Sequence, residues 1–352
     1  MSISRRQILA ASLASPLFAR SALAWQEPAK SQGTTWQEQT AQSEKAIRRG
    51  TDWMLKTMNR DGGCGVDIGQ PPDIGCSSMV GLALLSMGNT PIEGPRAQEV
   101  RQIISYLLRV VENMPADDIT SVTGTQLQNK IGRHAHSFFA ATFLSQVLGE
   151  GYDIEPVRVA LKRVVTAIVN SQQASGNWGD QSWAPMLGTV MGWVSLRAAD
   201  AVGLKVGKSP ETTANHIIQT MGGTLNEGSW MHTLYKNATG VRVLFAMGRD
   251  NEDVAKKAFK GVEDLVKRDN TAFSQAGGEE YLAFHLITET MLQKGGDDWK
   301  AWFPVIRDKI IAVQNSDGSW TGHHCITSRT FCTAAAILVL SSPNRYLPIS
   351  QL

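Results

Sequence analysis

The feature that most constrains the fold of this chain is a repeated alternation of charged and apolar segments. Six charged segments with helical spacing run roughly over 41–58, 97–112, 156–171, 209–220, 251–267 and 299–314. Six segments rich in Ala, Gly, Leu, Met and Thr run roughly over 76–87, 136–148, 185–201, 237–247, 281–292 and 330–341. Successive apolar segments start 60, 49, 52, 44 and 49 residues apart. A period of this length indicates a repeat architecture.

The two kinds of segment predict helices in two different environments. In the last charged segment, apolar residues recur every three or four positions from Trp302 to Val313, which is typical of an amphipathic helix. The apolar segments carry few charges on any side, so each is expected to be buried on most of its faces. Six such pairs predict an all-α (α/α)6 toroid, with an open solenoid as the alternative. No alternating strand pattern of useful length is present, which disfavours a β-rich fold.

A second signal lies in the turns between the paired helices. Gln173–Trp178 and Gln314–Trp320 share a Gln-x2–3-Gly-x-Trp pattern, and Glu227–Trp230 is a shorter copy. The segments 61–64 and 275–278 are degenerate copies. Glycine permits the positive φ of a tight turn, and tryptophan can pack over the next turn with its N–H paired. The motif is therefore expected to hold neighbouring units together.

These turns, their spacing and the alternation resemble the prenyltransferase and squalene-oxidase repeat family. That family includes triterpene cyclases and the β subunits of protein prenyltransferases. The resemblance covers roughly 41–345, and the end of the chain from Cys332 to Pro348 looks most like exported bacterial members. It implies one domain over 41–352 with the toroid fold, and it is poorly specific for the reaction.

The triterpene cyclases of this family protonate their substrate with a DxDD motif, which this sequence lacks. The pairs Asp117-Asp118 and Asp297-Asp298 lie in polar stretches beside helices, where solvated or helix-capping carboxylates are ordinary. Those cyclases also carry two α-barrel domains, whereas this chain has the length for one. Full triterpene cyclisation is therefore not expected.

The protein prenyltransferases of the family hold zinc with an Asp, a Cys and a His at the toroid mouth. Here Asp73-Ile-Gly-Cys76 opens the first inner helix, and the family's His falls near Cys332 at the start of the last one. Closure of the ring would place these two helices side by side. The resemblance thus implies a zinc site, although with changed ligands and with no partner subunit in evidence.

Most of the cysteines and histidines of the chain are expected at this one rim. The candidate metal ligands are Asp73, Cys76, His134, His136, His323, His324, Cys325 and Cys332. Thiolate, imidazole and carboxylate are the ligands that zinc prefers in proteins. The alternatives are disulfides, Cys64–Cys76 or Cys325–Cys332, and plain buried cysteines with no partner.

The inner helices also offer candidates for an apolar ligand pocket, namely His232, Tyr281 and His285. A hydrogen-bonded core histidine is the simpler interpretation of His285. The sequence leaves three functions open. The first is an enzyme with a metal-assisted or acid-assisted centre that acts on an apolar, isoprenoid-like ligand. The second is a non-catalytic protein that binds a peptide, lipid or glycan, and the third is a domain whose rim cysteines form structural disulfides.

The N-terminus predicts export. Arg5 and Arg6 precede an apolar run from Ile8 to Phe18, and Ala22-Leu23-Ala24 is an A-x-A cleavage signature. The order resembles a twin-arginine signal over 1–24, with a polar linker over 25–40, and predicts a periplasmic protein. The apolar run is too short to span a bilayer. With 34 basic and 32 acidic residues, the chain has a net charge of +2, which gives no support to a nucleic-acid partner.

Overall fold

The computed structural model describes residues 38–115, 124–179, 182–223, 234–235, 239–268 and 271–347. Its chain from Glu38 to Leu352 forms one compact unit. The expected signal over 1–24 and the linker up to residue 37 lie outside the described residues. Within the described ranges the secondary structure is helical, with two isolated β-bridges and no strand. None of these helices is long and apolar enough to cross a membrane.

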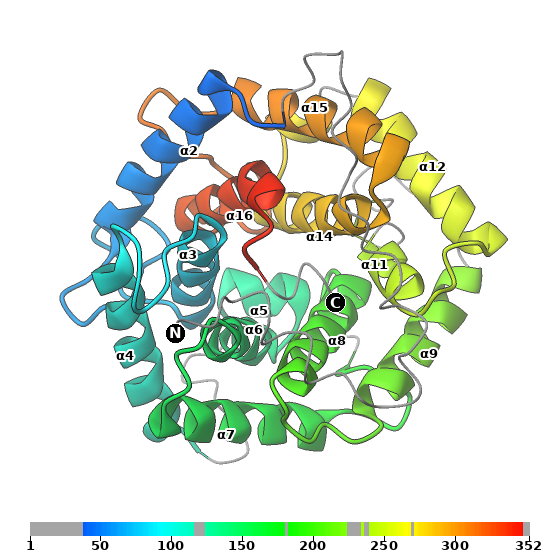
Figure 1. Cartoon of the computed structure of the whole chain (residues 1–352). Helices are drawn as coiled ribbons and strands as arrows, with labels where there is room; N and C mark the ends of the chain where they lie inside the picture. The colour runs from blue at the N-terminus through cyan, green and yellow to red at the C-terminus, as the bar shows by residue number, and fades with distance from the viewer. Residues whose placement is uncertain are drawn as a thin grey trace, which may run out of the picture. The chain divides into compact units, whose positions relative to one another are not determined.

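Twelve of the helices form two concentric rings (Figure 1). The outer ring consists of α2 (Ala41–Met54), α4 (Ala97–Glu112), α7 (Glu155–Ser171), α9 (Ser209–Gly223), α12 (Asp253–Arg268) and α15 (Gly296–Ala312). The inner ring consists of α3 (Ile74–Ser86), α6 (Ala135–Gly149), α8 (Pro185–Ala201), α11 (Thr239–Ala246), α14 (Gly278–Lys294) and α16 (Arg329–Ser341). The predicted pairing of a charged outer helix with an apolar inner helix is confirmed in all six units.

The inner ring is closed. Each inner helix packs against the next, and the last, α16, packs against the first, α3, as well as against α2. Every residue of α3 and twelve consecutive residues of α16 are buried, as their apolar sequences predict. The fold is therefore a closed (α/α)6 toroid, and the open solenoid is wrong.

The turn motif joins neighbouring units as predicted. The indole Nε1 of Trp178 donates to Ile168 O, and that of Trp320 donates to Ile310 O, each at 2.8 Å. Gly318 has a φ of +99°, and a Cβ there would lie 2.7 Å from Arg49 O of the adjacent outer helix α2. One assignment within the motif is corrected. Gln172, not Gln173, matches Gln314, since each side-chain amide donates to the carbonyl of the turn glycine four residues later.

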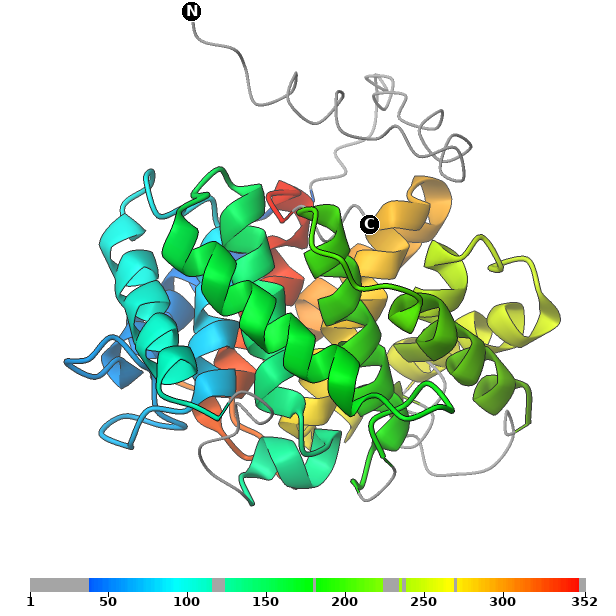
Figure 2. The same cartoon turned by 90° about the horizontal axis from the view of Figure 1, so that it is seen from below.

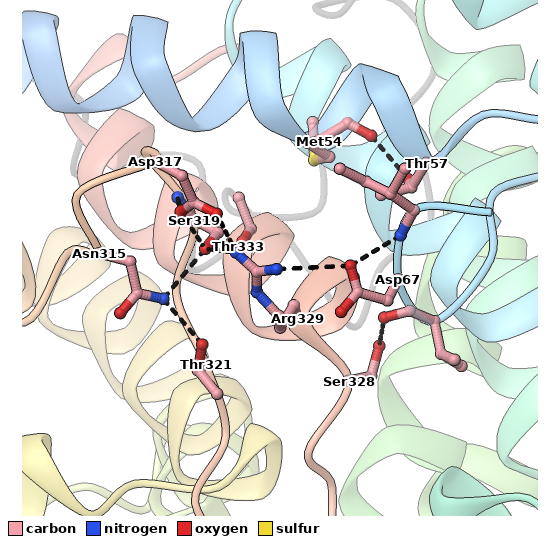
Figure 3. A network of polar contacts seen from close by, with 12 residues as sticks. Met54, Thr57, Asp67, Asn315, Asp317, Ser319, Thr321, Ser328, Arg329 and Thr333 are labelled. Atoms are coloured by element: carbon pink, nitrogen blue, oxygen red, sulfur yellow. Dashed lines mark hydrogen bonds and ion pairs between the residues drawn. The ribbon is translucent and has the colours of Figure 1, made fainter. Parts of the chain in front are cut away.

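Figure 3 shows the polar network that ties the last unit to the first. Arg329, at the start of α16, forms ion pairs with Asp317 and with Asp67, and its Nη2 donates to Ser319 Oγ at 2.6 Å. Its guanidinium carbon lies 4.5 Å from the centroid of the Trp53 ring of α2. The seam of the ring is thus held by charge, hydrogen bonds and a cation–π contact around one side chain.

Two short helices were not predicted, α5 (Gln126–Ile131) and α13 (Thr271–Ser274). Helix α5 is capped by Thr125, whose hydroxyl accepts from the Gln128 backbone N–H in a capping box. In Figure 2, α5 lies at one end of the barrel, and the C-terminal end of α16 lies at the opposite end.

Candidate functional site

The candidate site lies where the inner helices begin. Each inner helix follows the turn after its outer partner, so the inner helices start at the same end of the barrel. Helix α5, the segment 323–328 before α16, and the first residues of α3, α6 and α14 come together there. This end is called the rim below.

Two glutamates at the first turn of α14 form the centre of the rim. Glu279 and Glu280 have no solvent exposure. Glu280 Oε2 accepts a 2.7 Å hydrogen bond from Gly277 N, which caps the helix, and Glu279 Oε2 accepts from Ile326 N at 3.2 Å. The partial positive charge of a helix N-terminus stabilises carboxylates, so the backbone of α14 favours glutamates at these two positions. Glu280 Oε1 is buried and has no hydrogen-bond partner among the described residues.

Two side chains from other elements, Lys130 and His324, contact these glutamates. Lys130 of α5 places its Nζ 3.1 Å from Glu279 Oε1 and 3.5 Å from Cys325 Sγ. Its ammonium also lies 4.4 Å from the centroid of the Tyr235 ring. His324 bridges the pair, with Nδ1 3.1 Å from Glu279 Oε1 and Nε2 3.3 Å from Glu280 Oε2.

The two carboxyl groups are adjacent, buried and unequally compensated. Burial and then the charge of Glu279 raise the pKa of Glu280, the hydrogen bond from Gly277 and the charge of Lys130 lower it, and the net value is about 8. Burial opposes the charge on Lys130, but the Coulomb attraction and hydrogen bond of Glu279 raise its pKa above the usual value. The raised pKa favours a protonated Glu280 at neutral pH, and the ammonium group of Lys130 lies beside Glu279. Such a pair can deliver one proton to a bound molecule.

A second polar group lies where α3 and α6 begin. Asp73 caps α3 by accepting from Cys76 N at 2.7 Å, and its other oxygen lies 3.3 Å from His136 Nε2. Burial opposes ionisation of Asp73, but the hydrogen bond and charge of His136 lower its pKa below the usual value. Cys76 Sγ lies 3.4 Å from Ser328 Oγ, which confirms that the first and last inner helices meet.

The predicted metal ligands are divided among separate places. Among the described residues, the group whose donor atoms lie within 4.8 Å of one another is Glu279, His324 and Cys325. Asp73, Cys76 and His136 form the second group, but their three donor atoms do not all lie within 4.8 Å of one another. His323 is exposed, and His134 is half-buried at the start of α6, where its ring lies 6.4 Å from that of Phe138. Cys332 is buried, and burial raises its thiol pKa well above the usual value.

All four cysteines are free thiols, so neither of the two alternative disulfides is formed. Cys64 takes the tryptophan position of the first turn motif, and burial raises its pKa to about 12. Burial likewise raises the thiol pKa of Cys76 and Cys332, which disfavours thiolate, the nucleophilic form, at these three buried positions.

The predicted pocket residues lie deeper along α14. Tyr281 and His285 are on one face of the helix with Glu289, at intervals of four residues. His285 Nε2 lies 3.6 Å from Glu289 Oε1, and Glu289 Oε2 lies 4.0 Å from Arg242 Nε of α11. The third predicted residue, His232, and the pair Asp117-Asp118 lie outside the described residues. Asp297 is fully exposed and Asp298 pairs with Lys294 at 2.8 Å, as expected for surface carboxylates.

Sequence reasoning missed Glu279, Glu280 and Lys130. A signal for the glutamates was present, since two adjacent acids follow a degenerate turn motif and open an otherwise apolar inner helix. Lys130 carried no comparable signal, because α5 is too short to show a periodic pattern.

Comparison with known proteins identifies the fold. No family model and no curated protein matches the sequence. Among solved structures, the chain is similar to type II terpene cyclase MstE from Scytonema. In a variant bound to geranylgeranyl dihydroxybenzoate as substrate, the TM-score is 0.55 at 14% identity, covering 87% of this chain and 98% of that one. For apo MstE the TM-score is 0.54 at 14% identity, with 87% and 99% covered. The chain thus has a terpenoid cyclase-like α/α toroid fold.

Proposed function

We propose that the protein is a cyclase-like enzyme that protonates an apolar, isoprenoid-like substrate, with Glu280 as the proton donor. The observation that carries this proposal is the buried pair Glu279 and Glu280: neither side chain is exposed to solvent, and Glu280 Oε1 has no hydrogen-bond partner among the described residues. A carboxyl group can donate a proton to a bound alkene only while it holds one, and a site shielded from water protects the cation that forms. The fold supports a cyclase-like activity, and the apolar inner helices suit a hydrocarbon ligand.

The surrounding residues have distinct roles in this proposal. Lys130 compensates the charge of Glu279, so that the proton shared by the two carboxyl groups resides on Glu280. Gly277 fixes Glu280 Oε2 through the cap hydrogen bond, which leaves Oε1 to carry the acidic proton. His324 contacts both carboxyl groups and can return a proton to Glu280 from the half-exposed edge of the site.

Incubation in D2O with an all-trans geranylgeranyl ester as probe tests this assignment. We expect the wild type to form cyclic products that carry one carbon-bound deuterium per proton delivered. Glu280→Gln should lower the rate at least about 100-fold, since positioned acids contribute factors of this size. The surface variant Glu112→Gln is the matched control and should retain the rate. Unchanged turnover by Glu280→Gln overturns the proposal, and probe binding without turnover by the wild type favours a non-catalytic binding protein.

A zinc-dependent centre is the second candidate, because Glu279, His324 and Cys325 converge. Their carboxylate, imidazole and thiol groups are zinc ligands by type, and zinc there would act as a Lewis acid toward a bound substrate. Lys130, however, already places a cation 3.1 Å from Glu279 and 3.5 Å from Cys325. Elemental analysis of the purified protein distinguishes the zinc-dependent centre from the metal-free proton donor. About one bound zinc ion per chain, with no zinc bound to the double variant His324→Ala with Cys325→Ala, favours the metal-assisted centre.

Export is part of the proposed function. The Arg5-Arg6 pair and the A-x-A signature support a twin-arginine route with cleavage after Ala24, which places the enzyme in the periplasm. Mass measurement of the protein recovered from its host tests this. A mature wild-type chain that starts at Trp25 supports the route, as does retention of the double variant Arg5→Lys with Arg6→Lys in the cytoplasm. An uncleaved wild-type chain in the cytoplasm contradicts it.

A further inference from the structure

A groove on the outside of the barrel lies between the first turn motif and the outer helix α4. Its volume is about 350 Å³, and three arginine side chains, Arg60, Arg101 and Arg109, line it. We propose that this groove binds a phosphate monoester, either a soluble one or the headgroup of a lipid. The groove shares no residue with the rim, so the proposal does not depend on the proposed function.

The two walls of the groove are held in fixed positions. Gly62 of the turn lies so close to α4 that a Cβ on it would be 2.3 Å from Gln102 O. Arg109 Nη2 donates to Asp61 O in the turn, and Arg109 Nε donates to Ser105 O of its own helix at 3.4 Å. These contacts fix the turn against the helix, so the groove is formed before any ligand binds.

The three arginines carry charge that the described part of the chain does not neutralise. None of them forms an ion pair there, and Asp52 and Glu99 pair with Arg96 instead. Arg60 also makes no hydrogen bond within the described ranges. With Asp61 as the acid in the lining, the groove has a formal net charge of 3 − 1 = +2. A phosphate monoester, which carries a charge of about −1.5 to −2 at pH 7, would neutralise it.

The donors of the groove suit the oxygens of a phosphate group. A guanidinium has five N–H groups, and the described contacts use two of them in Arg109 and one in Arg101, whose Nη1 donates to Pro91 O at 2.5 Å. The remaining N–H groups can pair with phosphate oxygens, while the backbone contacts hold both side chains in place. Arg101 and Arg109 are eight residues apart, about 12 Å along the axis of α4. This length leaves room for the organic arm of an ester beside the phosphate.

Comparison of the repeats shows that arginines are not needed to build such a junction. At three junctions the turn glycine, Gly62, Gly176 or Gly318, lies against a carbonyl of the next outer helix, that of Gln102, Thr212 or Arg49 respectively. In register with these contacts, the positions of the three arginines hold Ala174, Glu211 and Gln219 at the second junction and Ser316, Arg48 and Lys56 at the third. The packing of turn on helix therefore does not account for three arginines at the first junction, whereas a bound anion does.

Titration calorimetry of the full-length protein at low salt tests the site with glycerol 3-phosphate as the probe, because salt screens exposed charges. We expect saturable binding by the wild type that weakens at least about tenfold in the double variant Arg60→Gln with Arg101→Gln, since each arginine contributes charge-assisted hydrogen bonds. Arg60→Gln alone removes no contact of the described residues and should weaken binding about threefold. No saturable binding by the wild type, or equal affinity in the double variant, overturns the proposal.

The matched control removes two positive charges elsewhere on the outer ring. The double variant Lys256→Gln with Lys257→Gln lies on α12, across the barrel from α4, and both lysines are exposed (Figure 1). It should bind the probe as tightly as the wild type does. An equal loss of affinity in this control shows attraction by overall charge and overturns the proposal.

Two further probes define the ligand. Succinate, a dianion with two separate carboxylates, should bind about tenfold more weakly than glycerol 3-phosphate, whose charge lies on the three oxygens of one group. Equal binding of succinate overturns the assignment of a phosphate. Co-sedimentation with phosphatidylcholine vesicles that contain phosphatidic acid distinguishes the two sources. Vesicle binding that is lost in Arg60→Gln with Arg101→Gln supports a lipid headgroup, and binding of glycerol 3-phosphate without vesicle binding supports a soluble ester.

Discussion

Lys130 Nζ lies 3.1 Å from Glu279 Oε1, and this contact joins the short helix α5 to the first turn of the fifth inner helix. Both side chains are almost fully buried, with exposures of 5% and 0%. Removal of one partner would leave a buried charge uncompensated. The pair therefore links the stability of the rim to the protonation state of its carboxyl groups.

Lys130→Met should lower the free energy of unfolding by about 3–5 kcal/mol, the usual cost of leaving one member of a buried ion pair alone. The double variant Lys130→Met with Glu279→Gln should recover much of that loss, because no buried charge remains. Urea unfolding of both variants measures the difference. Equal stabilities for the single and double variants would show that the pair is not energetically coupled.

The raised pKa of Glu280 predicts a pH dependence of stability with a definite sign. Its folded pKa, about 8, lies above the unfolded value near 4.5, so the folded state binds more protons between these values. The stabilisation is complete below pH 4.5 and is lost as the pH rises toward 8, at up to about 1.4 kcal/mol per pH unit. Glu280→Gln should flatten this slope. Urea unfolding midpoints of the wild type and Glu280→Gln from pH 5 to 9 test this. Identical dependence of the midpoint on pH in the two proteins would contradict the assignment.

The seam of the ring predicts a pH dependence of opposite sign. Burial opposes ionisation of Asp317, but hydrogen bonds from Ser319 and then from Arg329 lower its pKa to about 2. A lowered pKa stabilises the fold above pH 4, and this contribution disappears as the pH falls toward 2. Because Asp317 is half exposed, the effect should stay within about 1 kcal/mol. Arg329→Ala should reduce the acid sensitivity, and acid unfolding midpoints identical to wild type would refute the role of this pair.

The turn motif predicts unequal costs for two glycine substitutions. Gly318 and Gly203 have φ values of +99° and +84°, but only Gly318 has backbone within reach of a new Cβ, at 2.7 Å from Arg49 O. Gly203→Ala should cost about 1–2 kcal/mol from backbone conformation alone. Gly318→Ala should cost clearly more, because α2 would have to move. Thermal unfolding compares the two, and a smaller loss for Gly318→Ala would show that the close approach is not needed.

The double ring could be predicted from the sequence because its periodicity covers six long segments. Helix α5 could not, since its six residues, Gln126–Ile131, are mostly polar and owe their place to a capping box and to contacts with other units. The motif register was off by one at Gln172 for a similar reason. Two adjacent glutamines, Gln172 and Gln173, fit the sequence pattern, and only the hydrogen bonds of the structure show which of them occupies the motif position.

The sequence predicted a candidate site where the inner helices begin, and the structure brings only some of the predicted residues together there, beside glutamates that the prediction lacked. His324 and Cys325 were recognised by residue type, whereas Glu279 and Glu280 resembled ordinary acids at a helix start. Their burial depends on closure of the ring, which brings α5 and the segment before α16 onto α14. His285 was expected to be a satisfied core histidine, and the distances around it, which no sequence pattern encodes, leave one nitrogen unpartnered.

The central claim is that Glu280 holds a proton at neutral pH in a buried site. Infrared difference spectroscopy of protein with carbon-13-labelled glutamate measures this directly, by comparing the wild type with Glu280→Gln across pH 5 to 10. We predict a protonated carboxyl band at pH 7 that is absent in Glu280→Gln and titrates near pH 8. A Glu280 that is already ionised at pH 6 would contradict the claim, and with it the assignment of the proton donor.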